Sequence, residues 1–222
     1  MIAALDRIDI GAIGYQDKLD LLRAYSLTFI RLGSPNEATK QRLIEKFDPM
    51  LPATQRELNW ELAEMLVYLE APSAPAKLMS LLRNAPSLPF YASREWINPI
   101  LRSRGNPGLT GPAGASDANL MKQEDQIQYA ELLRVVKNGW TPELREEYFR
   151  WFPTMGAFRG GSAYSAGIQT IKADAVSQLP PDARQALQAV IDLPMVGRGR
   201  GGGGGGGGGA PAPRGGAAPA GN

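Results

Sequence analysis

Two residue types are missing from this chain of 222 residues: it has no cysteine and no histidine. Without them the chain can form no disulfide, no Cys/His zinc site and no c-type haem attachment. A Cys nucleophile and a Ser-His-Asp triad are excluded as well. Catalysis would have to rest on carboxylate, Lys, Arg, Tyr, Ser or Thr side chains. No group of these indicates an active site, so we expect no enzyme, no cofactor and no metal.

Long hydrophobic runs are missing too. No apolar run approaches the roughly 18–20 residues that a transmembrane helix needs, so we expect no membrane span. The first residues, 1–7, lack the basic stretch followed by an apolar stretch that marks a signal peptide. The sequence itself leaves the location open: we expect either a cytoplasmic protein or an internal piece of a longer precursor.

Excess charge is also missing from most of the chain, although the net charge is +2. From Gly197 onward the charged residues are Arg198, Arg200 and Arg214, which leaves 21 basic residues against 22 acidic ones before that point. A nearly neutral body disfavours a dedicated nucleic-acid surface. The terminal Arg-Gly pairs are similar to RNA-binding arms, but no aromatic residue lies among them, which favours a spacer.

What the sequence does contain is helical periodicity, which predicts an all-α fold. Apolar residues recur every three or four positions, and Gly or Pro breaks separate the segments. The clearest unit runs from Tyr129 to Phe152: Gly139 is expected to stop the first helix, Thr141 to cap the second and Pro142 to occupy its first turn. Four helix pairs are predicted: 16–32 with a short helix ending at Asp48, 54–69 with 75–83, 129–138 with 142–152, and 163–179 with 181–193.

The prolines between paired helices recur at nearly constant spacing. Pro35 and Pro72 are 37 residues apart, Pro142 and Pro181 are 39 apart, and Pro72 and Pro142 are 70 apart. A period near 40 is typical of HEAT or armadillo repeats, in which hairpins stack because none buries its apolar face alone. We therefore predict a HEAT/armadillo-like α-solenoid of about four helical hairpins over residues 1–196. The double spacing predicts a rim insertion at about 87–119, and residues 197–222 are expected to form a disordered Gly/Pro-rich tail.

One group of residues is a candidate interaction surface: Trp140, Arg145, Arg150 and Arg159. Aromatic rings beside arginines suit ligand or protein recognition. The alternative, which we favour, is that Trp140 plugs the hairpin turn. By the same reasoning Trp151 belongs to the core.

Two further groups have simple structural explanations. The stretch 160–162, Gly-Gly-Ser, can present backbone N–H groups to an anion, but a turn between helices explains it better. Glu57, Glu61 and Glu64 lie on one side of a helix, and paired carboxylates can carry out acid–base catalysis. Because they alternate with an apolar face, we interpret them as a solvated polar surface.

Several segments, which together span most of residues 15–192, carry a family resemblance. They are 21–25 with 30–33, 66–72, 126–130 with 133–136, 139–141 (Gly-Trp-Thr), 144–145 and 148–149, and 159–162 with 171–175. These segments resemble the helical region of one group of large bacterial extracytoplasmic proteins. In that group a sugar-dehydrogenase-like propeller is followed by HEAT-like helices and then a c-type cytochrome domain.

The resemblance implies that this chain corresponds to the connecting helices, without the propeller or the haem domain, and it suggests a periplasmic or secreted location. None of the family's catalytic or haem-ligating residues falls in this region. We expect a non-catalytic helical-repeat scaffold or protein-interaction module, a piece of a larger multidomain protein, that binds another protein or a neighbouring domain of its parent chain. The alternative is the helical connecting region of a haem-containing, sugar-dehydrogenase-like oxidoreductase.

Overall fold

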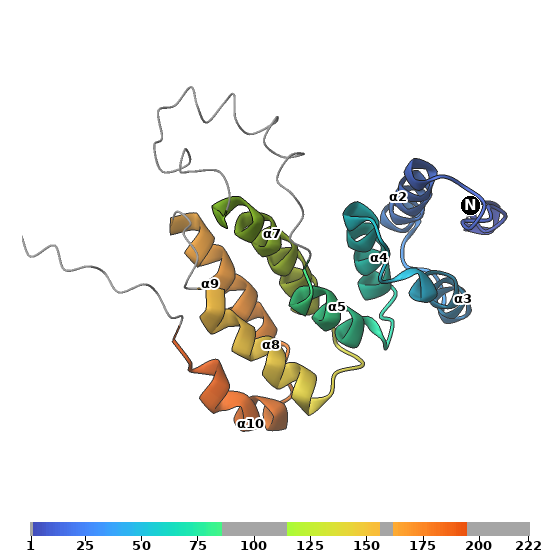
Figure 1. Ribbon diagram of the computed structural model, residues 1–222. Coiled ribbons are helices and arrows are strands. Elements are labelled where there is room, and N and C mark those ends of the chain that lie inside the picture. Colours follow the sequence, from blue (N-terminus) through green and yellow to red (C-terminus); the bar gives the residue numbers. More distant parts are fainter. Residues whose placement is uncertain (1, 86–114, 156–161, 195–222) are drawn as a thin grey trace, which may run out of the picture.

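The computed structural model describes residues 2–85, 115–155 and 162–194, with side chains from residue 124 in the second segment and from 165 in the third. These segments contain nine α-helices, one 3₁₀ turn and no strand. The predicted all-α class is therefore confirmed for the part of the chain that the structure describes. Figure 1 shows the helices following one another in chain order, with α2 and α3 at one end and α9 and α10 at the other.

The N-terminal end consists of α1 (Ile2–Leu5), α2 (Tyr15–Leu32), α3 (Glu37–Phe47) and the 3₁₀ turn η1 (Asp48–Met50). The spacing of Leu22, Tyr25, Phe29 and Leu32, by three and four positions, predicts one apolar face on α2. The first three residues are buried, but Leu32 is 66% exposed. It is the last residue of α2, where the helix ends at Gly33, and its spacing alone does not bring it under a neighbouring helix.

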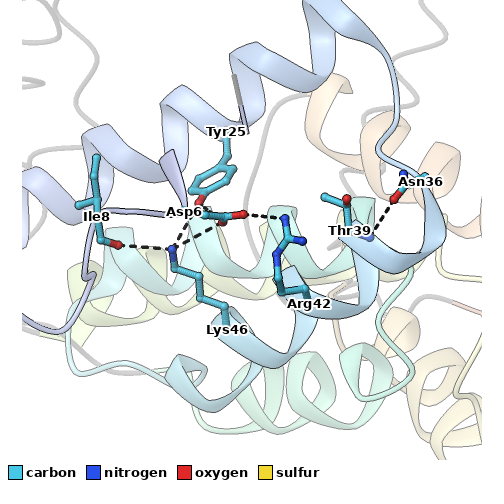
Figure 2. A network of polar contacts seen from close by, with 7 residues as sticks. All are labelled: Asp6, Ile8, Tyr25, Asn36, Thr39, Arg42 and Lys46. Atoms are coloured by element: carbon cyan, nitrogen blue, oxygen red, sulfur yellow. Dashed lines mark hydrogen bonds and ion pairs between the residues drawn. The ribbon is translucent and has the colours of Figure 1, made fainter. Parts of the chain in front are cut away.

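A side-chain cap fixes the start of α3, but at a different residue from the one predicted. Asn36 is the N-cap, and its Oδ1 accepts a hydrogen bond from the Thr39 backbone N–H at 2.9 Å (Figure 2). The Ser34-Pro35 pair predicts Ser34 as the cap and Pro35 as the first residue of the helix. Because both residues precede the helix, that prediction is wrong. Asn is at least as good a cap as Ser, because its side-chain oxygen reaches the same unpaired N–H groups.

The next pair is α4 (Arg56–Tyr68) and α5 (Ala74–Arg83). The end of α4 is a Schellman motif: the Ala71 N–H bonds the Leu66 carbonyl at 2.9 Å, and the Glu70 N–H bonds the Val67 carbonyl at 3.0 Å. This motif places Glu70 at φ 60°. Glycine is usual at this position because a side chain is strained at positive φ.

Helix α7 (Ala115–Leu133) begins earlier than the sequence pattern indicated. Residues 115–119, at the end of the predicted rim insertion (about 87–119), belong to this helix. Residues 86–114 lie outside the described part. The first half of α7 lacks apolar periodicity and is rich in polar residues, so periodicity could not detect it.

The second helix of the same pair, α8 (Pro142–Thr154), begins as predicted. Thr141 is the N-cap, with its hydroxyl accepting from the Leu144 N–H at 3.3 Å, and Pro142 is in the first turn. The last pair is α9 (Ser162–Ser177) and α10 (Pro181–Ile191), and Pro181 again starts the second helix. The start of α8 and that of α10 thus follow from the local sequence.

The described helices contact one another in two series. In the first, α2 packs on α4, α4 on α7, and α7 on α9; in the second, α5 packs on α8, and α8 on α10. Asp48 of η1 extends the second series toward α3, since its carboxylate forms an ion pair with Lys77 of α5 at 2.9 Å. One apolar core runs through these contacts; its fully buried members include Leu22, Tyr25, Leu43, Phe47, Leu62, Leu66, Leu78, Tyr129, Tyr148, Phe149 and Phe152.

A polar network attaches the N-terminal segment to α2 and α3 (Figure 2). The Asp6 carboxylate accepts hydrogen bonds from the Tyr25 hydroxyl and from the Arg42 guanidinium, each at 2.6 Å. Lys46 donates to the Ile8 carbonyl at 3.4 Å and to the Tyr25 hydroxyl at 3.3 Å. Asp6 therefore serves as a common acceptor that holds three chain segments together.

Candidate functional site

Trp140 lies in the turn between α7 and α8 and is half-buried. Its Nε1–H donates to the Val136 carbonyl at 2.8 Å, and its ring lies 5.6 Å from the Tyr148 ring. The neighbouring Gly139 has φ 79°, and a Cβ built on it would stand 1.9 Å from the Pro72 carbonyl oxygen. These contacts support the interpretation of Trp140 as a plug of the turn, in a loop pressed against the α4–α5 loop.

Arg145 is the candidate residue that the structure brings to Trp140. Its guanidinium carbon lies 5.8 Å from the centre of the indole ring, within cation–π range. Burial lowers the pKa of Arg145 from its usual value, because the charged form loses hydration. The two residues border a cleft of about 20 Å³ between α7, α8 and the end of α9, which has room for about one water molecule.

The other two candidate residues are not part of this arrangement. Arg150 is exposed on α8 and pairs with Glu146, one turn earlier, at 2.6 Å. Five positions separate it from Arg145, which places it about 140° away around the helix. Arg159 lies outside the described residues, as do Gly160 and Gly161 of the proposed anion site. The structure thus joins Trp140 and Arg145 but does not add Arg150 to them.

The aromatic residues of α8 are structural. Trp151 is 7% exposed, and its ring meets the Phe152 ring edge to face at 5.0 Å. The buried Tyr148 donates its hydroxyl proton to the Ala130 carbonyl at 2.7 Å, and burial raises the pKa of Tyr148. The prediction that Trp151 belongs to the core is confirmed.

The carboxylates of α4 have a use that the sequence did not suggest. Glu57 accepts a hydrogen bond from the Tyr15 hydroxyl at 2.8 Å, and Glu61 pairs with Arg23 of α2 at 3.2 Å. These two residues connect α4 to α2, so the polar surface also serves the helix contact.

A larger hollow lies between the C-terminal end of α4 and that of α7, and we call it the α4–α7 groove. Its volume is about 610 Å³. Its lining residues are mainly apolar but include two carboxylates and one lysine. The lining residues are Glu64, Val67, Tyr68, Glu70, Ala71, Ala74, Leu132, Val135, Val136, Lys137, Asn138 and Gln178.

Two apolar side chains of the groove are exposed: Tyr68 by 45% and Val135 by 49%. The Tyr68 ring stacks on Phe29 of α2 at 5.2 Å, and α2 carries four more exposed large apolar side chains, Tyr15, Leu27, Ile30 and Leu32. In the described part, no large apolar side chain of α3, α5, α8 or α10 is exposed. Most of the exposed large apolar side chains therefore lie on α2, at the end of α4 and just after α7, a feature that the helical pattern did not single out.

Glu64 supplies the groove with negative charge. Its Oε1 accepts from the Gln128 side chain at 3.2 Å, and within the described segments it has no ion-pair partner. Burial raises the pKa of Glu64, and the nearby Glu61 carboxylate raises it further. Its charge is thus without a cation, unlike that of Glu61, which Arg23 neutralises.

A second polar cluster is buried between α4 and α7. The Asp125 carboxylate accepts from Arg56 at 2.6 Å and from the Trp60 indole at 3.1 Å, and Arg56 also pairs with Glu124 at 3.0 Å. The other Asp125 oxygen, Oδ2, is buried without a hydrogen-bond partner among the described residues. Burial raises the pKa of Asp125, against the opposing effect of Arg56. We interpret this cluster as a connection between the helices, because its contacts join residues of α4 to residues of α7.

No described helix is long and apolar enough to cross a membrane. Within residues 2–85, 115–155 and 162–194, no three metal-ligating side chains cluster at a possible ion site. Comparison of the chain with protein families, with curated proteins and with solved structures found no match.

Proposed function

We propose that this chain is a non-catalytic helical-repeat scaffold of the HEAT/armadillo type, with about four hairpins. It binds another protein or a neighbouring domain of a longer parent chain. The two series of helix contacts carry this proposal, because stacked hairpins place first helices against first helices and second helices against second helices. The spacing of 37 and 39 residues between the hairpin prolines supports the same arrangement.

The side-chain chemistry also supports a binding role. The conspicuous charged groups, such as Arg23 with Glu61 and Arg83 with Glu147 at 2.5 Å, are paired across neighbouring helices. The one strongly buried carboxylate of the described part, Asp125, is held by Arg56 and Trp60. What remains on the surface is an apolar groove and long polar helix faces, which suit protein contacts.

Capture of a partner from the source cells tests the proposal. The tagged full chain is crosslinked in the cells, purified, and its partners are identified by mass spectrometry. We expect one polypeptide at a fixed ratio to the bait. Failure to recover any polypeptide above the level of a tag-only control would contradict the scaffold role.

Two variants then locate the contact. Arg150→Glu reverses an exposed charge on the second-helix face, and Arg7→Glu is the matched control near the N-terminus. Partner loss with Arg150→Glu alone assigns binding to the second helices. A captured haem-containing dehydrogenase or its domain would favour the alternative role as a connecting region of such an enzyme.

A further inference from the structure

The α4–α7 groove combines three properties that are rarely found together on a surface without a function. It is large enough, at about 610 Å³, to receive several side chains. Its exposed apolar residues, Tyr68 and Val135, leave water in contact with hydrocarbon. Its Glu64 carboxylate has no cation among the described residues.

Glu70, the second carboxylate of the groove, has a strained backbone. Its φ is 60°, a conformation in which glycine would be more stable, and its side chain is half exposed. Strained non-glycine residues persist where a side chain is needed, and they concentrate at binding sites. The chain thus keeps a carboxylate at the groove at a cost in stability. Lys40 of α3 forms an ion pair with the Glu70 carboxylate at 3.3 Å, whereas Glu64 has no ion-pair partner among the described residues.

From these features we propose that the α4–α7 groove is the docking site for a cationic amphipathic helix of a partner protein. Large apolar side chains of that helix fill the space beside Tyr68 and Val135, and a Lys or Arg three or four positions away pairs with Glu64. The proposal rests on the proposed role as an interaction module and assigns it a surface and a partner class.

A helix is the expected form of the partner because of the groove walls. The hydrogen-bonding groups of the walls are largely used within α4, α5 and α7, and no strand edge is present in the described part. An added β-strand would find no backbone partners, so recognition must come from side chains, as in helix-in-groove binding.

The negative charge of the groove favours a positively charged partner. Two carboxylates and one lysine line it, and the C-terminal ends of α4 and α7, which carry partial negative charge, point to the same place. The chain's own arginines, Arg198, Arg200 and Arg214, have the right sign. However, residues 197–222 contain no apolar side chain larger than Pro, so they cannot fill the apolar part.

Peptide selection on the full chain tests the proposal. A phage library of random peptides is selected against the immobilised 222-residue protein, and enriched peptides are synthesised with a fluorescent label. We expect sequences that place Lys or Arg three or four positions from a bulky apolar residue. Enrichment of acidic or uncharged peptides, or of none, would overturn the proposal.

Binding of the labelled peptides to variants then locates the site by fluorescence anisotropy. Val135→Glu should weaken binding about tenfold or more, and Glu64→Gln about fivefold, because a cation loses its partner at a partly covered site. Glu45→Gln, the same change on an exposed residue of α3 outside the groove, should have no effect. Circular dichroism checks that all three variants fold. Unchanged affinity for both groove variants would place the peptide elsewhere and overturn the proposal.

Two outcomes would assign the groove to other occupants and also overturn the proposal. The first is a dimer in sedimentation that Val135→Glu dissociates, which indicates a second copy of the chain. The second is tighter peptide binding after deletion of residues 197–222, which indicates the chain's own terminus. If the captured cellular partner is lost with Arg150→Glu but retained by both groove variants, the scaffold role stands and the groove proposal fails.

Discussion

Asp125 illustrates how a single residue can connect two helices and still be poorly solvated. Arg56 and Trp60 satisfy one of its oxygens, whereas Oδ2 is buried without a hydrogen bond among the described residues. Burial, the largest effect, raises the pKa of Asp125 above its usual 3.8. The folded protein therefore keeps this proton to a higher pH than the unfolded chain does.

This difference predicts a pH dependence of stability. Where the folded state binds more protons, the free energy of unfolding falls as pH rises. The fall begins near the ordinary pKa of 3.8 and ends above the raised folded value. We expect the unfolding free energy of the native protein, relative to Asp125→Asn, to decrease over this window. Urea titrations of both proteins across a pH series measure the difference; an increase with pH would show that attraction to Arg56 dominates.

Tyr25 provides a second prediction. Its buried hydroxyl donates to the Asp6 carboxylate at 2.6 Å, so Tyr25→Phe should lower the free energy of unfolding by about 1–2 kcal/mol. Tyr15 is the control, because its hydroxyl donates to Glu57 at 2.8 Å but on the surface. Tyr15→Phe should cost about 0.5 kcal/mol or less. Equal losses in chemical denaturation would mean that burial does not strengthen the Asp6 contact.

Among the helices, the end of α4 is the clearest case of conformational strain. Glu70 has φ 60° within a Schellman motif, a position that glycine occupies at lower energy. We expect Glu70→Gly to stabilise the fold by about 1 kcal/mol in thermal or chemical denaturation. Glu70→Ala removes the same carboxylate but keeps the strained backbone, so it should bring no such gain. A destabilising Glu70→Gly would show that the carboxylate contributes more than its backbone costs.

The starts and ends of the helices could be predicted from the sequence only where a local interaction forms them. The cap of α8 followed from Thr141 and Pro142 because the interaction that forms it is local. The polar first half of α7 did not follow, because its sequence lacks the apolar repeat that marks a helix. Leu32 was placed wrongly for a different reason: periodicity gives the side of a helix but not the extent of the neighbour that covers it.

The site was less predictable than the helices. Trp140 as a turn plug could be inferred from its place after Gly139. The groove could not, because its walls come from residues 64–74 and 132–138, and their proximity is a tertiary property. Tyr68 and Val135, near the ends of α4 and α7, are a local signal, but large apolar residues are usually buried, so nothing in the pattern singled them out.

At the scale of the molecule, Gly139 brings the α7–α8 loop against the α4–α5 loop. A Cβ at this position would stand 1.9 Å from the Pro72 carbonyl oxygen, whereas a Cβ at Gly33 would meet nothing within 4 Å. Both glycines have positive φ, 79° and 85°, so both alanine variants suffer backbone strain. Gly139→Ala should cost about 1–3 kcal/mol more than Gly33→Ala, because the two loops must also move apart. Thermal denaturation measures both; equal losses would mean that the loops separate freely.

Helices α5 and α7 form the most extensive contact of any helix pair in the described part, although residues 86–114 lie between them in sequence. A peptide bond cut between residues 86 and 114 removes none of the described contacts, so the two fragments should remain associated and co-elute without denaturant. The same interval is therefore the place to divide the chain for fragment complementation, with a reporter half fused to each new end.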